Sequence, residues 1–342
     1  MIKIKSPLTR KEEVEILVES GANEFFCGVQ PSVWRKSFKS LAINQRGQSG
    51  NFQSFKELEL AIKDAHKLKS KVHVAMNGFF YLEGQYKLAN EIIRVILDLG
   101  ADGIIFADPV LISLSRKLLK DKDVIVGTDA TVFNHYSCSF FKGFGATRVV
   151  IPRATTIKEI EQIISYDKNI EYEVFIINDL CFFVDGFCAF CKETANDNHL
   201  LNLKNKSNKV MFFSSQKLPN KERGGCRSLM NKVRVTKNKI EQKSKYSFWN
   251  KKRIYGCGAC ALFDFNNIGV THVKILDRNL PMEEKVISTR FIKESLSFLK
   301  NNGLSKEEYI ERCKELFKRM FKFRCKPYDY CYYPSALIKK KK

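Results

Sequence analysis

Apolar residues follow two alternating patterns through the first 180 residues of the chain. Short apolar runs bounded by charged residues or glycine predict buried strands, and longer stretches with apolar residues three and four apart predict helices. The strand-like runs are, in order, Ile2–Lys5, Glu24–Cys27, Lys71–Ala75, Gly103–Phe106, Asp123–Gly127, Arg148–Ile151 and Glu171–Ile177.

Helical patterns separate most of these runs. We expect helices over Lys11–Glu19, Phe55–Leu68, Tyr86–Leu99 and Thr156–Ser165, and a further helix that opens at Pro109. Thr156 and Glu159 have the spacing of a capping box, in which each side chain satisfies a backbone N–H at the start of a helix. Gln30–Asn51 reads as an irregular loop.

The alternation stops at Cys181 and returns after about Ala261, with an eighth strand at Thr271–Ile275 and a helix near Ser288–Lys300. Eight strands alternating with helices predict parallel pairing and a (β/α)8 barrel of the TIM type, with an insertion after strand seven. An open doubly wound sheet is the alternative, but no GxGxxG or Walker motif supports it.

Four segments follow from this pattern. Residues 1–180 form the first seven β/α units, 181–261 the cysteine-rich insertion, 262–305 the last β/α unit, and 306–342 a basic helix and tail.

In such barrels the chemistry lies at the carboxyl ends of the strands. The polar residues there are catalytic candidates, although helix caps and turns use the same residue types. The candidates are Asn77, Asp108, Asp129 and Arg153, beside Cys27, Thr128 and Asn178.

The net charge of +22 is concentrated in two places. Residues 201–253 carry 16 basic and two acidic side chains, and residues 313–342 carry ten basic and two acidic ones. A localised basic surface indicates a polyanion such as RNA, and a lysine-rich composition without any partner is the alternative. No apolar run is long enough for a membrane span, and the N-terminal residues lack the apolar block of a signal peptide. We therefore expect a cytoplasmic protein.

Six of the eleven cysteines lie in or beside the insertion. In the cytosol such clusters bind metals more often than they form disulfides. The two CxxC pairs, Cys188/Cys191 and Cys257/Cys260, would make a zinc site. A second set of four, Cys181, Cys188, Cys226 and Cys260, would suit zinc or an iron–sulfur cluster, and spacing does not choose between the sets.

Several stretches resemble peptidase family U32, the collagenase-like peptidases. They are NFQSFKELELAIKDAHKLKSKVHVAMN, GADGIIFADPVLI, GATRVVIPRATTIKEIEQI, EVFIINDLCFFVDGFC, GGCRSLM and CGACALFDFNNIGVTHVKILDR. The resemblance implies a barrel-like fold and, as in several members, a four-iron cluster serving oxygen-independent hydroxylation of a quinone ring or an RNA pyrimidine. Matched motif by motif, it implies Cys181, Cys188, Cys226 and Cys260 as ligands, with Cys191 and Cys257 as alternates.

Three functions follow as hypotheses. The first is such a hydroxylase, with RNA bound by residues 201–253 and the C-terminal tail, and with a partner subunit as a further expectation. The second is a peptidase with Cys27 or another thiol as nucleophile, although no GxSxG, HExxH or Cys/His pair is apparent. The third is a zinc-stapled module that binds RNA or protein. Cys313, Cys325 and Cys331 are interpreted as structural, because a metal site there lacks an identifiable fourth ligand.

Overall fold

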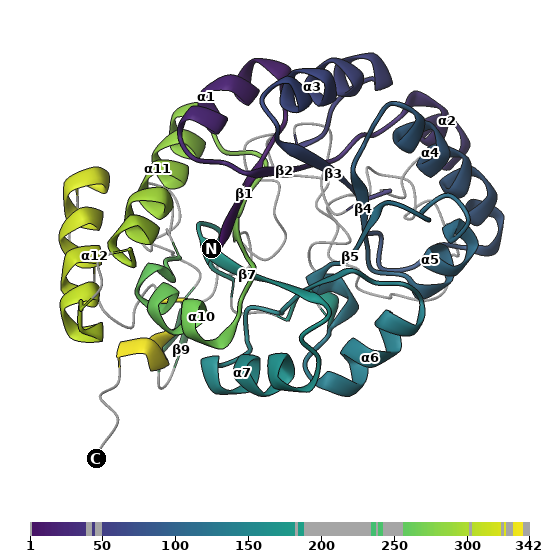
Figure 1. Cartoon of the computed structure of the whole chain (residues 1–342). Helices are drawn as coiled ribbons and strands as arrows, with labels where there is room; N and C mark the ends of the chain where they lie inside the picture. Colours follow the sequence, from purple (N-terminus) through teal and green to yellow (C-terminus); the bar gives the residue numbers. More distant parts are fainter. Residues whose placement is uncertain are drawn as a thin grey trace.

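The computed structural model describes residues 2–38, 43–44, 50–181, 184–187, 234–236, 239–241, 256–300, 303–322, 325 and 331–337. Eight parallel strands close into a barrel in the order β1-β10-β7-β6-β5-β4-β3-β2 (Figure 1). They are β1 Lys3–Pro7, β2 Glu24–Cys27, β3 Lys71–Met76, β4 Gly103–Phe106, β5 Asp123–Val126, β6 Arg148–Val150, β7 Glu171–Ile177 and β10 His272–Ile275. The TIM-type barrel predicted from the sequence is therefore confirmed.

Helices surround the barrel and follow the strands in sequence (Figure 1). They are α1 Val14–Glu19, α2 Ser32–Phe38, α3 Phe55–Lys67, α4 Tyr86–Asp98, α5 Pro109–Ser115, α6 His135–Gly143, α7 Ile157–Tyr166, α10 Leu262–Ile268, α11 Met282–Phe298 and α12 Lys306–Phe321. Helix α12 packs on the outside of α11. A short antiparallel hairpin, β8 Arg234–Thr236 with β9 Lys239–Glu241, lies in the insertion between β7 and β10.

The boundaries of several elements differ from the sequence prediction. The stretch read as an irregular loop, Gln30–Asn51, contains α2, whose Trp34 is buried. Helix α11 begins at Met282 rather than near Ser288, because its first turns bury Lys285 and other polar residues that obscure the apolar pattern. Helices α6 and α10 are short and were not predicted. The capping box of Thr156 and Glu159 is present.

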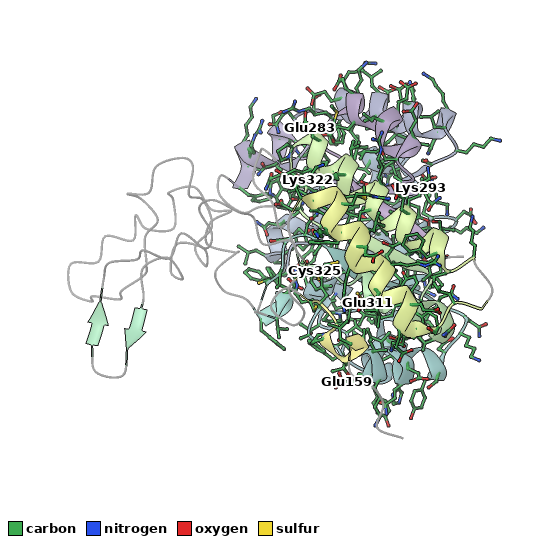
Figure 2. All side chains as sticks on the ribbon, turned by 90° about the vertical axis from the view of Figure 1, so that its left-hand side faces the viewer. Glu159, Glu283, Lys293, Glu311, Lys322 and Cys325 are labelled. Atoms are coloured by element: carbon green, nitrogen blue, oxygen red, sulfur yellow. The ribbon has the colours of Figure 1, made fainter. Side chains whose placement is uncertain are left out.

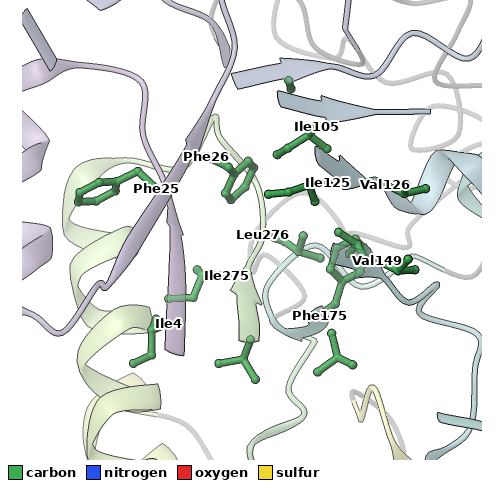
Figure 3. Close-up of a cluster of buried hydrophobic side chains, with 14 of the residues drawn as sticks. Ile4, Phe25, Phe26, Ile105, Ile125, Val126, Val149, Phe175, Ile275 and Leu276 are labelled. Carbon is green, nitrogen blue, oxygen red and sulfur yellow. The ribbon is translucent and has the colours of Figure 1, made fainter. Parts of the chain in front are cut away.

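The interior of the barrel has two tiers. The upper tier is apolar and includes Phe26, Ile105, Ile125 and Phe175, which converge on the barrel axis (Figure 3). Phe25 points to the opposite side of strand β2 from Phe26, as the alternation of a strand requires (Figure 3). Side chains therefore fill the barrel as a packed core.

The lower tier, at the amino ends of the strands, is ionic. Arg148 of β6 donates to both oxygens of Glu24 of β2 at 2.6 and 3.2 Å, and to Glu173 of β7 at 3.2 Å. Lys5 of β1 donates to Glu173 at 3.1 Å, and Nε2 of His272 of β10 lies 3.1 Å from Glu24. All five side chains are buried. We call them the ionic floor.

Mutual pairing offsets the energetic cost of burying these charges inside the barrel. Burial acts to raise the pKa of Glu24, but hydrogen bonds from His272 and Arg148 and the charge of Lys5 hold it well below its usual range. Burial lowers the pKa of Lys5 to about 7 despite the attraction of Glu173. Beside the floor, burial and the charge of Lys5 lower the pKa of His73 to about 4. Its Nε2 lies 2.9 Å from the Asp123 carboxylate.

No helix in the described part of the chain is long and apolar enough to cross a membrane.

His73 predicts a specific pH dependence of stability. The folded chain keeps this imidazole neutral down to about pH 4, whereas the unfolded chain binds a proton below about pH 6.5. Unfolding therefore takes up a proton in this window, and the free energy of unfolding falls by about 3 kcal/mol as the pH drops through it. Denaturant unfolding of His73→Gln should show a smaller loss between pH 6.5 and pH 4.

The control is His66→Gln, since the His66 side chain is 43% exposed on α3. This variant replaces a histidine that pairs with Asp102 on the surface, and its pH profile is the reference for that of His73→Gln. An unchanged profile in His73→Gln would show that another group titrates in this window.

Candidate functional site

Two of the predicted candidates meet at the carboxyl ends of the strands, the mouth of the barrel. Asn77 follows β3, and Asp129 lies in the short 3-10 helix η4, Thr128–Ala130, that follows β5. Nδ2 of Asn77 donates to Oδ2 of Asp129 at 2.6 Å. The pair places an amide and a carboxylate side by side at the position where barrel enzymes bind substrate.

Asp108 caps a helix. It is the N-cap of α5, and its Oδ1 accepts from the backbone N–H groups of Val110 and Leu111 at 2.7 and 3.2 Å. Its Oδ2 accepts from the hydroxyl of Tyr86 at 2.9 Å. Both oxygens are engaged in holding α5 and α4, which is the helix-cap role expected of many strand-end residues.

Cys27 is a poor nucleophile in this position. The side chain is fully buried, and burial raises the pKa of its thiol to about 12. A thiolate is the reactive form, so this environment disfavours the cysteine-peptidase hypothesis as applied to Cys27.

After β7 the chain turns sharply toward the residues that carry Cys181, which we call the cysteine segment. Asn178 and Asp179 have φ values of 71° and 43°, in the left-handed region that non-glycine residues rarely adopt. The side chain of Asn178 is held by Ser288 of α11, with Nδ2 and Oγ 3.1 Å apart. Such consecutive outliers are typical of functional segments. They direct the chain to Cys181, which is partly exposed at the mouth.

Arg153 clamps both sides of Cys181. Its Nη1 donates to the carbonyl oxygen of Asp179 at 2.6 Å, and Nε and Nη2 donate to the two carboxylate oxygens of Asp185 at 3.2 and 2.9 Å. The guanidinium also lies over the ring of Phe175, 4.8 Å from its centroid. Burial acts to lower the pKa of Arg153, but the interaction with Asp185, and smaller ones with Tyr332, Asp179 and Cys181, hold it above its usual value. Arg153 is thus a positioning residue for the cysteine segment.

The segment after Cys181 is docked on the loop that carries Asp129. Asp185–Phe187 forms the 3-10 helix η5, which packs on η4. A Cβ at Gly186 would stand 2.2 Å from Cγ2 of Thr131 and 2.5 Å from the carbonyl oxygen of Asp129. Only glycine permits this approach. The neighbouring Phe187 side chain is 77% exposed.

A C-terminal segment closes the site from the outside. Tyr332 and Tyr333 are buried, the Tyr332 hydroxyl donates to the carbonyl oxygen of Asn178, and that of Tyr333 donates to Phe175 at 2.9 Å. Cys257 pairs with Ile177 of β7 on one side and with Cys331 on the other. The segment at Cys331 therefore lies beside the end of β7, with Cys257 between them.

The predicted ligand cysteines fall in different places. Cys188, Cys191 and Cys226 lie outside the described residues. Cys260 lies in the 3-10 helix η7, Ala259–Ala261, where burial and the charges of Cys313, Cys325 and Cys331 raise the pKa of its thiol. Among the described residues, no three His, Cys, Asp or Glu side chains converge tightly enough to hold a single metal ion.

Several residues of the site were missed in the sequence. Asp185, Gly186, Tyr332 and Tyr333 act through contacts with residues far away in the chain. The only local signal in the sequence was the Asp-Gly pair formed by Asp185 and Gly186, between Cys181 and Cys188, because this dipeptide is typical of tight turns.

The match to a family model agrees with this architecture. Residues 9–336 match the model of peptidase family U32. This chain belongs to that family. The membership confirms the resemblance seen in the sequence motifs.

The U32 chain is also similar to curated proteins. It is 29% identical over 187 residues to tRNA hydroxylation protein P of Helicobacter pylori strain 26695, covering 55% of this chain and 42% of that protein. It is 27% identical over 198 residues to tRNA hydroxylation protein P1 of Bacillus subtilis strain 168, covering 58% and 44% respectively. Each match thus spans less than half the length of the relative.

Among solved structures, the U32 peptidase Mk0906 is 18% identical with a TM-score of 0.40, covering 53% of this chain and 71% of that one.

Gly186→Ala tests whether docking of η5 positions the cysteine segment. The added methyl group must displace Thr131 or the Asp129 backbone. Overpacking of this kind costs about 1–3 kcal/mol. Hydrogen exchange measured by mass spectrometry should accelerate in peptides covering Asn178–Phe187.

Gly84→Ala is the matched control, because no heavy atom lies within 4 Å of a Cβ at that position. Equal exchange rates in Gly186→Ala and wild type would show that the packing of η5 on η4 does not restrain the segment.

Proposed function

We propose that this U32 protein takes part in oxygen-independent hydroxylation of a tRNA base, with a 4Fe-4S cluster bound at the mouth of the barrel. The single observation that carries the proposal is the clamped presentation of Cys181, which the Arg153 bonds to Asp179 and Asp185 hold at the carboxyl end of β7. The names of the curated relatives support tRNA as the substrate class.

The residues around Cys181 fit a thiolate ligand. Iron–sulfur clusters are held by Cys thiolates, and a nearby cation favours the ionised form of a thiol. Arg153 is that cation, and its electrostatic interaction with Cys181 acts in this direction. The apolar ring of Phe175 lies against this cation, 4.8 Å from the guanidinium carbon.

Cys181, Cys188 and Cys226 supply three ligands in this proposal, as the motif match implies. The match gives Cys260 as the fourth. Cys191 and Cys257 are the alternates from the sequence. A bound cluster would supply one-electron redox chemistry or a Lewis-acidic iron.

The other side chains at the mouth have the chemistry needed to hold a nucleotide. The Asn77–Asp129 pair presents an amide and a carboxylate, which can hydrogen-bond the edge of an extruded base. Phe187, exposed on η5 and anchored through Gly186 to the Asp129 loop, offers a stacking surface. The 201–253 basic segment and the C-terminal lysines are proposed to bind the phosphate backbone.

Cys181→Ser tests the cluster. Anaerobically purified wild type should contain iron and acid-labile sulfide, with a broad absorption band near roughly 400 nm. The variant should lose about four iron and four sulfide per chain. In cells in which this variant replaces the wild-type protein, mass spectrometry of tRNA nucleosides should show the loss of a nucleoside that is one oxygen atom heavier than its unmodified form.

Cys138→Ser is the control, since Cys138 is a buried thiol on α6 beside the Tyr172 hydroxyl. It should retain wild-type iron and modification. Zinc in place of iron would favour the zinc-stapled module. Unchanged tRNA with modified quinones would redirect the proposal to a small aromatic substrate.

Binding of tRNA should depend steeply on salt. Each neutralised phosphate changes the slope of log affinity against log salt by about 0.7 to 0.9. Replacing Lys339–Lys342 by glutamine should flatten this slope. Replacing Lys56, Lys63 and Lys67 on α3, which pair with acidic neighbours, should leave it unchanged. An affinity independent of Lys339–Lys342 would exclude the tail from the RNA surface.

A further inference from the structure

Three exposed aromatic side chains lie on two neighbouring helices of the outer wall. They are Tyr136 and Phe140 of α6 and Tyr166 at the end of α7, which are 76%, 53% and 66% exposed. Tyr136 and Phe140 are four residues apart and therefore lie on one face of α6. Helices α6 and α7 pack side by side in the ring around the barrel (Figure 1). We call these three residues the aromatic patch.

The patch differs from the surface of the other outer helices. Lys293 of α11 and Glu311 of α12 are examples of the charged side chains that cover the wall there (Figure 2). A single exposed apolar side chain is common in proteins, whereas several gathered in one place indicate a binding surface.

Rings in this region are stacked on one another. The centroid of the His135 ring lies 3.6 Å from that of Tyr166, with the two planes 9° from parallel, and 3.9 Å from that of Tyr136, at 37°. Two rings cannot share one face of the imidazole at these distances, so His135 lies between the tyrosines. The exposed tyrosines at the two ends of the stack can therefore take a further planar ring on their outer faces.

Contacts beneath the stack hold it in place. Asn134 caps α6, and its Oδ1 accepts from the backbone N–H of Ser137 at 2.9 Å. Lys142 of α6 donates to the carboxylate of Asp167, the residue that follows Tyr166. The rings are thus ordered before a ligand binds, which reduces the entropic cost of binding.

The chemistry of the patch favours a nucleobase as its partner. Every base has a π-face that stacks on aromatic side chains, and unpaired bases of RNA are available for such contacts. The net charge of +22 attracts a polyanion to the protein.

The patch also lies within reach of the mouth. His135 follows Asp129 by six residues, so even a fully extended chain places their Cα atoms no more than about 22 Å apart. One RNA molecule can therefore contact the mouth and the patch together.

We infer that the aromatic patch binds an unpaired nucleotide of the substrate RNA, separate from the nucleotide at the mouth. The base stacks on the outer face of Tyr136 and so continues the stack of Tyr166 and His135. Phe140, one turn further along α6, offers a ring to a second base. This inference rests on RNA as the proposed substrate, but not on the cluster or on the hydroxylation.

Substitutions of Tyr136 test the inference, with in vitro transcribed tRNA in a filter-binding assay. Tyr136→Ala should weaken binding by about 5- to 150-fold, the range expected for loss of one base–aromatic stack. Tyr136→Phe keeps the ring and should bind as wild type does. Tyr136→Leu keeps an apolar side chain without a ring face and should resemble Tyr136→Ala. The slope of log affinity against log salt should be the same in all three variants, because no phosphate contact is removed.

Leu114→Ala is the matched control, since Leu114 is a large apolar side chain that is 52% exposed on α5, outside the patch. It should bind tRNA with wild-type affinity. Wild-type affinity in both Tyr136→Ala and Tyr166→Ala would overturn the inference, and so would wild-type affinity in Tyr136→Leu. A dimeric wild type that becomes monomeric in Tyr136→Ala would also overturn it, because the patch would then be a protein interface.

This inference and the proposed function can fail separately. If Tyr136→Ala loses RNA affinity while Cys181→Ser leaves the tRNA nucleosides of the cell unchanged, the proposed hydroxylation fails and the stacking site stands. If Cys181→Ser abolishes the tRNA modification while Tyr136→Ala keeps wild-type affinity, the proposed function stands and the stacking site fails.

Discussion

The barrel depends on the pairing of buried charges at its floor. Glu24 and Glu173 are inside the barrel, and each would be costly there without a partner. Arg148 bridges them, while Lys5 and His272 complete the set from the two strands that close the barrel. Removing one member of such a buried set costs about 3–5 kcal/mol, because it leaves an unpaired charge. The floor therefore fixes the register of β1, β2, β6, β7 and β10 together.

That register determines what stands at the opposite end. Once β7 is aligned by Glu173, the two residues that follow the strand, Asn178 and Asp179, emerge beside Arg153 of the loop after β6. The floor at the amino ends provides stability, and the clamp at the carboxyl ends positions Cys181. In barrels of this type, the amino ends of the strands usually serve stability and the carboxyl ends carry the functional residues.

The sequence predicted the parts of the structure that depend on local pattern. The strands Glu24–Cys27, Gly103–Phe106 and Glu171–Ile177 were placed at their observed bounds, since each is a short apolar run between clear breaks. Helix α2 was missed because its single buried aromatic, Trp34, gives no periodic signal. Polar residues inside a barrel also mislead, because Lys5 and Glu173 look like surface positions in a strand.

The candidate site was predictable only in outline. Strand-end positions identified Asn77, Asp129 and Arg153, but not that the first two are bonded or that the third acts on Cys181. Asp108 shows the limit of predicting site residues from strand ends, because the residue that follows a strand can also be the N-cap of the next helix. Asp185 and Tyr332 required three-dimensional neighbours, since their partners are 32 and 154 residues away.

The docking of Tyr332 and Tyr333 on β7 has a consequence for the order of synthesis. The strands and helices of the barrel are complete once residues up to Phe298 have left the ribosome, and amino-terminal parts fold first during translation. The two tyrosines that secure the end of β7 follow much later. A nascent chain therefore has a formed barrel before the contacts that secure the end of β7 at the mouth are complete.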